Sequence, residues 1–221
     1  MSSPYPAGFF TIFVISMYLA GIPATLAESR SDLIKSLQAK LANEQLRQSA
    51  SLSGQDRALI CSYCHGSDGN SVKPDVPNLA GQNAVYLLEQ IGRFARSERK
   101  DFVMNSLARE FSEEDQINLA IFYSGKKVKP ARVDGQVAIR GKQTYQKNCK
   151  TCHGVKGLGS NQYARLAGQK RHYIEMTLKR FRASANNEVD KKRRSKIMES
   201  IASQLSDQQI QNLAAYVASL K

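Results

Sequence analysis

The chain has few of the residues from which small domains build a core or an enzyme active site. Its 221 residues include no tryptophan, three histidines and four cysteines, and aromatic residues make up only 8%. No paired carboxylates, nucleophile–base couple or phosphate-binding glycine loop stand out. The composition therefore argues against an enzyme that depends on those groups.

The scarce cysteines and histidines are concentrated in two copies of Cys-x-x-Cys-His, at 61–65 and 149–153. Two cysteines three residues apart lie on one side of a helical turn, where both sulfurs can add to the two vinyl groups of one haem. The histidine that follows can then ligate the iron. The motifs predict two haem c groups, attached by thioethers to Cys61, Cys64, Cys149 and Cys152 and ligated by His65 and His153.

Other uses of these cysteines are less consistent with the pattern. A Cys-x-x-Cys pair can form a redox dithiol, and two pairs can bind zinc. Neither arrangement needs the histidine that follows both pairs. A structural disulfide across so short a loop would contribute little loop-closure entropy. We therefore interpret both motifs as haem attachment sites.

The N-terminal 27 residues contain no Asp, Glu, Lys or Arg. An apolar run is followed by Thr25 and Ala27, small residues in the positions that signal peptidase requires. Residues 1–27 are therefore predicted to be a signal peptide, with an uncleaved anchor as the alternative because no basic segment precedes the run. Export agrees with haem attachment and predicts a bacterial periplasmic protein.

An internal repeat divides the remaining chain. Leu-Ala-Gly-Gln occurs at 79–82 and again at 166–169, each time before an expected helix, and the segment 111–123 matches 205–217. A serine N-cap opens each of these last two helices. The repeat predicts two homologous all-α domains, each wrapped around one haem that serves as its core. The predicted boundaries are domain 1 at 52–125, a linker at 126–135, and domain 2 at 136–221.

Residues 28–51 have no evident counterpart in the second half. Leu33, Leu37 and Leu41 recur at helical spacing, which predicts an amphipathic helix that extends domain 1 at its N-terminus. Such a helix would pack on its own domain, or would bind a partner or a membrane surface.

The repeat also selects candidates for the sixth iron ligand. Met104 and Met198 each lie seven residues before the start of the matching C-terminal segments, whereas Met176 aligns with Glu89 and His172 with Val85. Met176 is therefore read as a packing residue and His172 as a helix-face residue. His/Met ligation leaves no open iron position, which favours electron transfer over catalysis and raises the reduction potential.

The duplicated series of Cys-x-x-Cys-His, Leu-Ala-Gly-Gln, methionine and C-terminal Leu-Ala-x-Tyr/Phe helix resembles the dihaem cytochrome c family of the c-four type over residues 52–221. The resemblance implies two class I cytochrome c-like domains with approximate two-fold symmetry. It also implies periplasmic electron transfer, without enzymatic activity, from a respiratory-chain donor towards a terminal oxidase. Alternatives are a cytochrome subunit of a larger dehydrogenase, or a haem enzyme with a labile sixth ligand.

The copies differ where related cytochromes often use a proline carbonyl to accept the hydrogen bond of the haem histidine. Pro77 fits that role in domain 1, and Ala164 takes its place in domain 2. The carbonyl is retained, but the fixed backbone angle of proline is lost. We therefore predict unequal haem potentials.

The formal charge is +13. A basic run, Lys191-Lys192-Arg193-Arg194, precedes Met198. Such a run usually lies in a solvated loop, and if this one lies beside the edge of the second haem it would steer an acidic redox partner. Nucleic acid is the competing interpretation, which export and the absence of interleaved aromatic residues disfavour.

Overall fold

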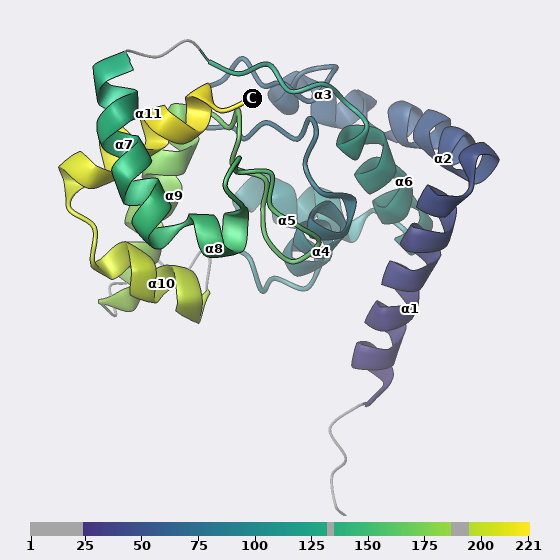
Figure 1. Cartoon of the computed structure of the whole chain (residues 1–221). Coiled ribbons are helices and arrows are strands. Elements are labelled where there is room, and N and C mark those ends of the chain that lie inside the picture. The colour runs from purple at the N-terminus through teal and green to yellow at the C-terminus, as the bar shows by residue number, and fades with distance from the viewer. Residues whose placement is uncertain (1–23, 132–134, 187–194) are drawn as a thin grey trace, which may run out of the picture.

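The computed structural model describes residues 24–131, 135–186 and 195–221, which form two helical domains without any strand in those ranges (Figure 1). The expected leader lies almost wholly in residues 1–23, outside the described part. The first helix begins at Ala24 and therefore includes Thr25 and Ala27. The cleavage site stays a prediction.

The first domain contains six helices within residues 24–131. Two long helices, α2 and α6, pack across each other, and α4 packs on α6 and on α5. The short helix α3 carries the first attachment motif. The bounds are α1 Ala24–Ala42, α2 Glu44–Arg57, α3 Leu59–His65, α4 Ala84–Ala95, α5 Phe102–Arg109 and α6 Glu113–Ser124.

The second domain repeats this arrangement with five helices in its described ranges, 135–186 and 195–221. Here α7 packs across α11, α9 packs on both α10 and α11, and the one-turn helix α8 carries the second motif. The bounds are α7 Gly135–Asn148, α8 Lys150–His153, α9 Arg171–Ala185, α10 Lys196–Ser203 and α11 Asp207–Ser219. The prediction of two tandem all-α domains is confirmed.

The long helices of each domain approach so closely that only glycine fits at their crossing. A Cβ atom on Gly54 of α2 would lie 2.2 Å from the carbonyl oxygen of Asn118 on α6. A Cβ atom on Gly141 of α7 would lie 2.0 Å from the carbonyl oxygen of Asn212 on α11. The same backbone contact therefore sets the helix crossing in both domains.

The predicted serine caps are confirmed as capping boxes. Ser112 Oγ accepts from the Asp115 N–H at 3.1 Å, and Ser206 Oγ accepts from the Gln209 N–H at 3.2 Å. The Asp115 and Gln209 side chains in turn accept from the backbone N–H of the serines. These reciprocal bonds satisfy N–H groups that the first helical turn cannot pair.

The prediction of one helix over 28–51 is wrong. The helix is interrupted at Asn43, whose side chain accepts from the Leu46 N–H and caps a new helix, α2. This helix continues past residue 52 to Arg57. The expected domain boundary thus falls inside α2, which is the counterpart of α7 in the second domain because Gly54 matches Gly141. Because the N-cap residue of one helix is not itself helical, the helix before it must end there. The spacing of apolar residues does not show such an interruption.

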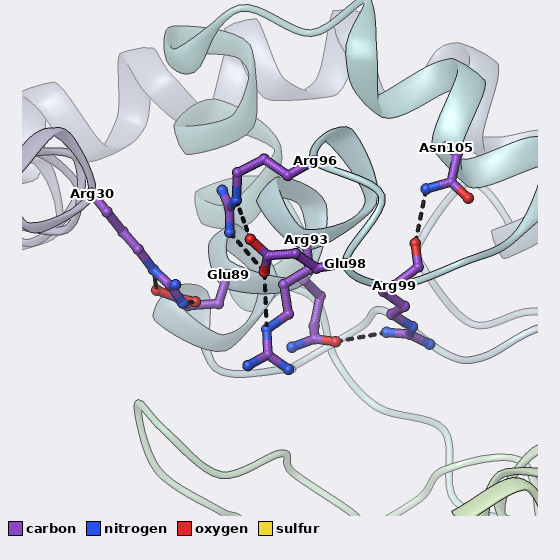
Figure 2. A network of polar contacts seen from close by, with 8 residues as sticks. Arg30, Glu89, Arg93, Arg96, Glu98, Arg99 and Asn105 are labelled. Carbon is purple, nitrogen blue, oxygen red and sulfur yellow. Dashed lines mark hydrogen bonds and ion pairs between the residues drawn. The ribbon is translucent and has the colours of Figure 1, made fainter. Parts of the chain in front are cut away.

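The helix α1 packs on its own domain. Leu37 is fully buried, and Leu33, Ile34 and Leu41 pack against the same apolar core. Ion pairs join Arg30 to Glu89 on α4 and Lys40 to Glu114 on α6 (Figure 2 shows the first). No helix among the described residues is long and apolar enough to cross a membrane.

The described part of the linker, residues 126–131, is bound to both domains. Lys129 donates its backbone N–H to Asn70 Oδ1 at 2.9 Å, and the Ala131 N–H donates to the Ala218 carbonyl at 3.0 Å. Val128 lies against both Gly81 and Gly168, the glycines of the two Leu-Ala-Gly-Gln turns. The linker therefore adds to the contact between the domains.

Candidate haem sites

The structure places each Cys-x-x-Cys-His motif on a short helix that follows the first long helix of its domain. Cys61, Cys64 and His65 lie within α3. Cys152 and His153 lie within α8, and Cys149 is the residue just before it. None of the four cysteines forms a disulfide. Each motif therefore presents two thiols and a histidine from one local segment.

Both motif histidines donate a hydrogen bond from Nδ1 to a backbone carbonyl. His65 donates to the Pro77 carbonyl at 2.9 Å, and His153 donates to the Ala164 carbonyl at 2.8 Å. A carbonyl oxygen can only accept, so Nδ1 carries the proton and Nε2 keeps its lone pair. The sequence predicted both contacts, and they leave each Nε2 suited to an iron.

Burial favours the neutral forms of three of these groups, His65, Cys61 and Cys149. Burial lowers the pKa of His65, and the hydrogen bond to Pro77 opposes that shift only in part. Burial raises the pKa of the Cys149 thiol to about 12, and it also raises the pKa of Cys61. A reactive dithiol needs a lowered pKa. The raised thiol pKa values therefore argue against a thioredoxin-like role.

The two candidate methionines occupy the same position in their helices. Met104 is the third residue of α5 and Met198 the third residue of α10, and both are half-buried. The backbone N–H of Met104 donates to the capping Asp101 side chain at 3.0 Å, and that of Met198 donates to the capping Ser195 Oγ at 3.4 Å. The register that the repeat predicted is thus present in the structure.

The residue after each methionine completes the cap. Asn105 Oδ1 accepts from the Asp101 N–H at 2.7 Å, and Glu199 Oε1 accepts from the Ser195 N–H at 3.1 Å. Asn105 also donates to the carbonyls of Phe94 and Arg99, which fastens the loop after α4 to the start of α5 (Figure 2 shows the bond to Arg99). These bonds fix the backbone from which each methionine projects.

The remaining candidates lie on α9. His172 is exposed, in agreement with a helix-face role, and Met176 is half-buried on the same helix. The basic run at 191–194 lies outside the described residues. Its proposed role in docking therefore rests on the sequence.

The residues around the motifs fit a large apolar cofactor. Each domain supplies the complete set of groups that bind a haem c: two thiols, an imidazole and a thioether. Apolar side chains beside the motifs and the methionines are exposed, and a planar apolar ring would cover part of that surface. These exposed residues are Leu59, Ile60, Tyr63, Val72, Phe102, Val103, Val155, Leu158 and Ile197.

Sequence reasoning missed the role of the glutamines in the repeated Leu-Ala-Gly-Gln string. Gln82 and Gln169 are buried and form hydrogen bonds to the opposite domain. The unchanged recurrence of the string was the available signal. It indicated a shared role, but no spacing in the sequence identifies the partner.

Comparison with known proteins gives a consistent result. The cytochrome c family model matches residues 138–221. Cytochrome c4 of Azotobacter vinelandii is 34% identical over 187 residues, which cover 76% of this chain and 87% of that protein. The thiosulfate dehydrogenase electron acceptor of Stutzerimonas stutzeri strain A1501 is 27% identical over 217 residues, which cover 91% of this chain and 94% of that protein.

The fold is likewise similar to a solved structure. The crystal structure of reduced recombinant cytochrome c4 from Pseudomonas stutzeri matches with a TM-score of 0.69 and 28% identity, over 77% of this chain and 98% of that one. A match of this length includes residues of both domains. The chain therefore belongs to the cytochrome c4 family, electron-carrying c-type cytochromes with two covalently bound haem groups.

Proposed function

We propose that the protein is an exported, periplasmic electron carrier in which both haem irons have histidine and methionine ligands. His65 and Met104 would ligate the iron in domain 1, and His153 and Met198 the iron in domain 2. The haem supplies the one-electron chemistry. The chain positions the ligands, keeps Nε2 of each histidine available and excludes water, without acting as an enzyme.

The observation that carries this proposal is the matching placement of the candidate ligands in two domains of different sequence. Both histidines are fixed by a carbonyl, and both methionines follow a helix cap in the same register. A methionine kept only for packing has no need of such a register. Two filled axial positions leave no site for a substrate, which favours electron transfer.

Single and double methionine variants test the ligation. Met104→Ala should abolish half of the methionine–iron absorption band of the oxidised protein, Met198→Ala the other half, and the double variant all of it. Met176→Ala is the matched control for Met198→Ala, because it removes another methionine of domain 2. It should leave the band unchanged. An unchanged band in either ligand variant would contradict the assignment.

The electron donor and acceptor are proposed at the level of class. A respiratory-chain donor and a terminal oxidase fit a carrier with comparatively high potentials. The likeness to a thiosulfate dehydrogenase electron acceptor favours a second candidate, in which a dehydrogenase supplies the electrons. Rapid mixing of the oxidised protein with a reduced thiosulfate dehydrogenase would discriminate, since only the second candidate expects saturable reduction of the haems.

We further propose that partners dock through an acidic surface. The net charge of +13 favours such partners, and the run Lys191-Lys192-Arg193-Arg194 is the candidate contact. Replacing these four residues with glutamine should slow electron transfer at low ionic strength and weaken its salt dependence. Equal rates at low salt would exclude this run from docking.

A further inference from the structure

The two domains exchange a reciprocal pair of glutamine contacts. Gln169 Oε1 accepts from the Asn78 N–H at 2.7 Å, and its Nε2 donates to the Asn78 carbonyl at 2.9 Å. In return, Gln82 Oε1 accepts from the Arg165 N–H at 2.7 Å, and its Nε2 donates to the Arg165 carbonyl at 3.0 Å. Each glutamine thus holds both backbone groups of one residue in the opposite domain.

Each N–H that a glutamine holds belongs to the peptide unit that binds a motif histidine. The peptide between Pro77 and Asn78 offers its carbonyl to His65 and its N–H to Gln169. The peptide between Ala164 and Arg165 offers its carbonyl to His153 and its N–H to Gln82. A single peptide group therefore connects each histidine to a side chain of the other domain.

The glutamines are built into this position. Gln82 is 6% and Gln169 is 7% exposed. Each Oε1 accepts a second hydrogen bond from the next backbone N–H, of Asn83 at 3.0 Å and of Lys170 at 2.9 Å. Their turns are anchored alike, since the glycine before each glutamine donates to the C-terminal helix of its own domain. Contacts within its own domain therefore help to orient each glutamine side chain.

We propose that Gln169 is a positioning residue for the haem of domain 1, and Gln82 for the haem of domain 2. A peptide whose N–H is hydrogen-bonded is polarised, so its carbonyl accepts more strongly. A stronger bond from Nδ1 makes the imidazole a better donor to iron, which stabilises the ferric state and lowers the potential. Each domain therefore tunes the haem of the other. This inference rests on the proposed histidine ligation.

The test measures both midpoint potentials in the haem-loaded protein, with each haem assigned by its own NMR signals. In Gln169→Leu, the potential of the domain 1 haem should rise while that of the domain 2 haem stays unchanged. Gln82→Leu should give the reverse. As a second readout, the Asn78 amide should exchange faster with solvent in Gln169→Leu, and the Arg165 amide faster in Gln82→Leu.

A second variant separates polarisation from loosening of the interface. Gln169→Glu keeps the acceptor for the Asn78 N–H and loses the donor to its carbonyl. The potential of the domain 1 haem should then not rise, whereas a loosened interface would shift the Leu and Glu variants in the same direction. Asn83→Ala is the matched control, because it removes bonds to the Leu158 and Tyr163 carbonyls and should leave both potentials unchanged.

Three outcomes would overturn the proposal. The midpoint potential could change only for the haem of the mutated domain, change equally for both haems, or not change at all. A failure of the histidine ligation itself has a different signature. It would appear in the unmutated protein as the loss of the low-spin spectrum, before any variant is compared.

Discussion

The two domains share one fold but fill the space beside the attachment motif with tyrosines from different helices. In domain 1, Tyr123 of α6 lies against Gly69, and in domain 2, Tyr145 of α7 lies against the equivalent Gly157. Val217 stands opposite Tyr123 in the match of 205–217 with 111–123, and Ala58 stands opposite Tyr145 when the crossing glycines Gly54 and Gly141 are matched. What the copies retain is a filled volume, because a core tolerates substitutions that conserve volume.

The same comparison shows a difference in hydrogen bonding. Tyr145 donates its hydroxyl to the Gly154 carbonyl at 2.6 Å. The Tyr123 hydroxyl is buried beside the Cys61 sulfur and has no oxygen or nitrogen partner among the residues that the structure describes. Burial raises the pKa of both tyrosines, so both stay protonated. Domain 2 therefore gains a polar contact behind its motif that domain 1 lacks.

The largest effect is expected where the domains are the same. Gly54→Ala and Gly141→Ala should each destabilise their own domain by about 3 kcal/mol or more, because the new Cβ atom would overlap a helix carbonyl. Hydrogen exchange resolved by domain would measure this. Gly125→Ala is the control, since its Cβ atom would meet ordinary contacts at 3.7 Å. If one of the two variants lost little stability, the helix crossings of the two domains would not be equivalent.

The tyrosines should respond unequally. Tyr145→Phe loses a buried hydrogen bond and leaves the Gly154 carbonyl without that donor, which should cost domain 2 about 1–2 kcal/mol. Tyr123→Phe removes a buried hydroxyl that lies beside the weakly accepting Cys61 sulfur, and should be neutral or stabilising for domain 1. Denaturant unfolding followed through each domain would measure both. Equal losses would show that the two hydroxyls are equivalent.

The haem potentials should differ because proline supplies the acceptor carbonyl in domain 1 and alanine in domain 2. A redox titration should resolve two midpoints separated by up to about 59 mV, a tenfold difference for one electron. Ala164→Pro should move the domain 2 midpoint towards the other. A titration that fits a single midpoint within error would remove this prediction.

The smallest effect concerns acid. Arg57 donates two hydrogen bonds to Asp115, at 2.8 and 2.9 Å, and these hold the pKa of Asp115 below its ordinary value. The ion pair of Asp115 with Arg57 contributes to stability above the pKa of Asp115 in the unfolded chain, about 3.9. This contribution is lost as the pH falls through the lower pKa of Asp115 in the folded protein.

The matching residue in domain 2 is Gln209, which does not titrate. Hydrogen exchange at decreasing pH should therefore show a loss in α6 that depends on Asp115, whereas an acid effect in α11 would come from Asp207, which Arg182 pairs. Asp115→Asn should remove that loss in α6. A loss in α6 that persists in Asp115→Asn would assign the acid effect to another group.

Much of the candidate site could be predicted because its chemistry is local. Two cysteines and a histidine within five residues share one helical turn, and the repeat places both methionines in one register. The serine caps also follow from a few neighbouring residues. The interruption at Asn43 was not predicted, because it depends on a single capping residue and leaves the spacing of the apolar residues unchanged.

The sequence by itself determined that this protein attaches two haems, in two helical domains, with histidine and methionine as the candidate ligands. The tertiary structure alone decided that each glutamine of the repeated string reaches the peptide behind the other domain's histidine, across 83 or 91 residues of sequence. It also decided which helix supplies each tyrosine. Attachment depends on covalent spacing within one turn, whereas these contacts exist only once separate helices and domains have packed.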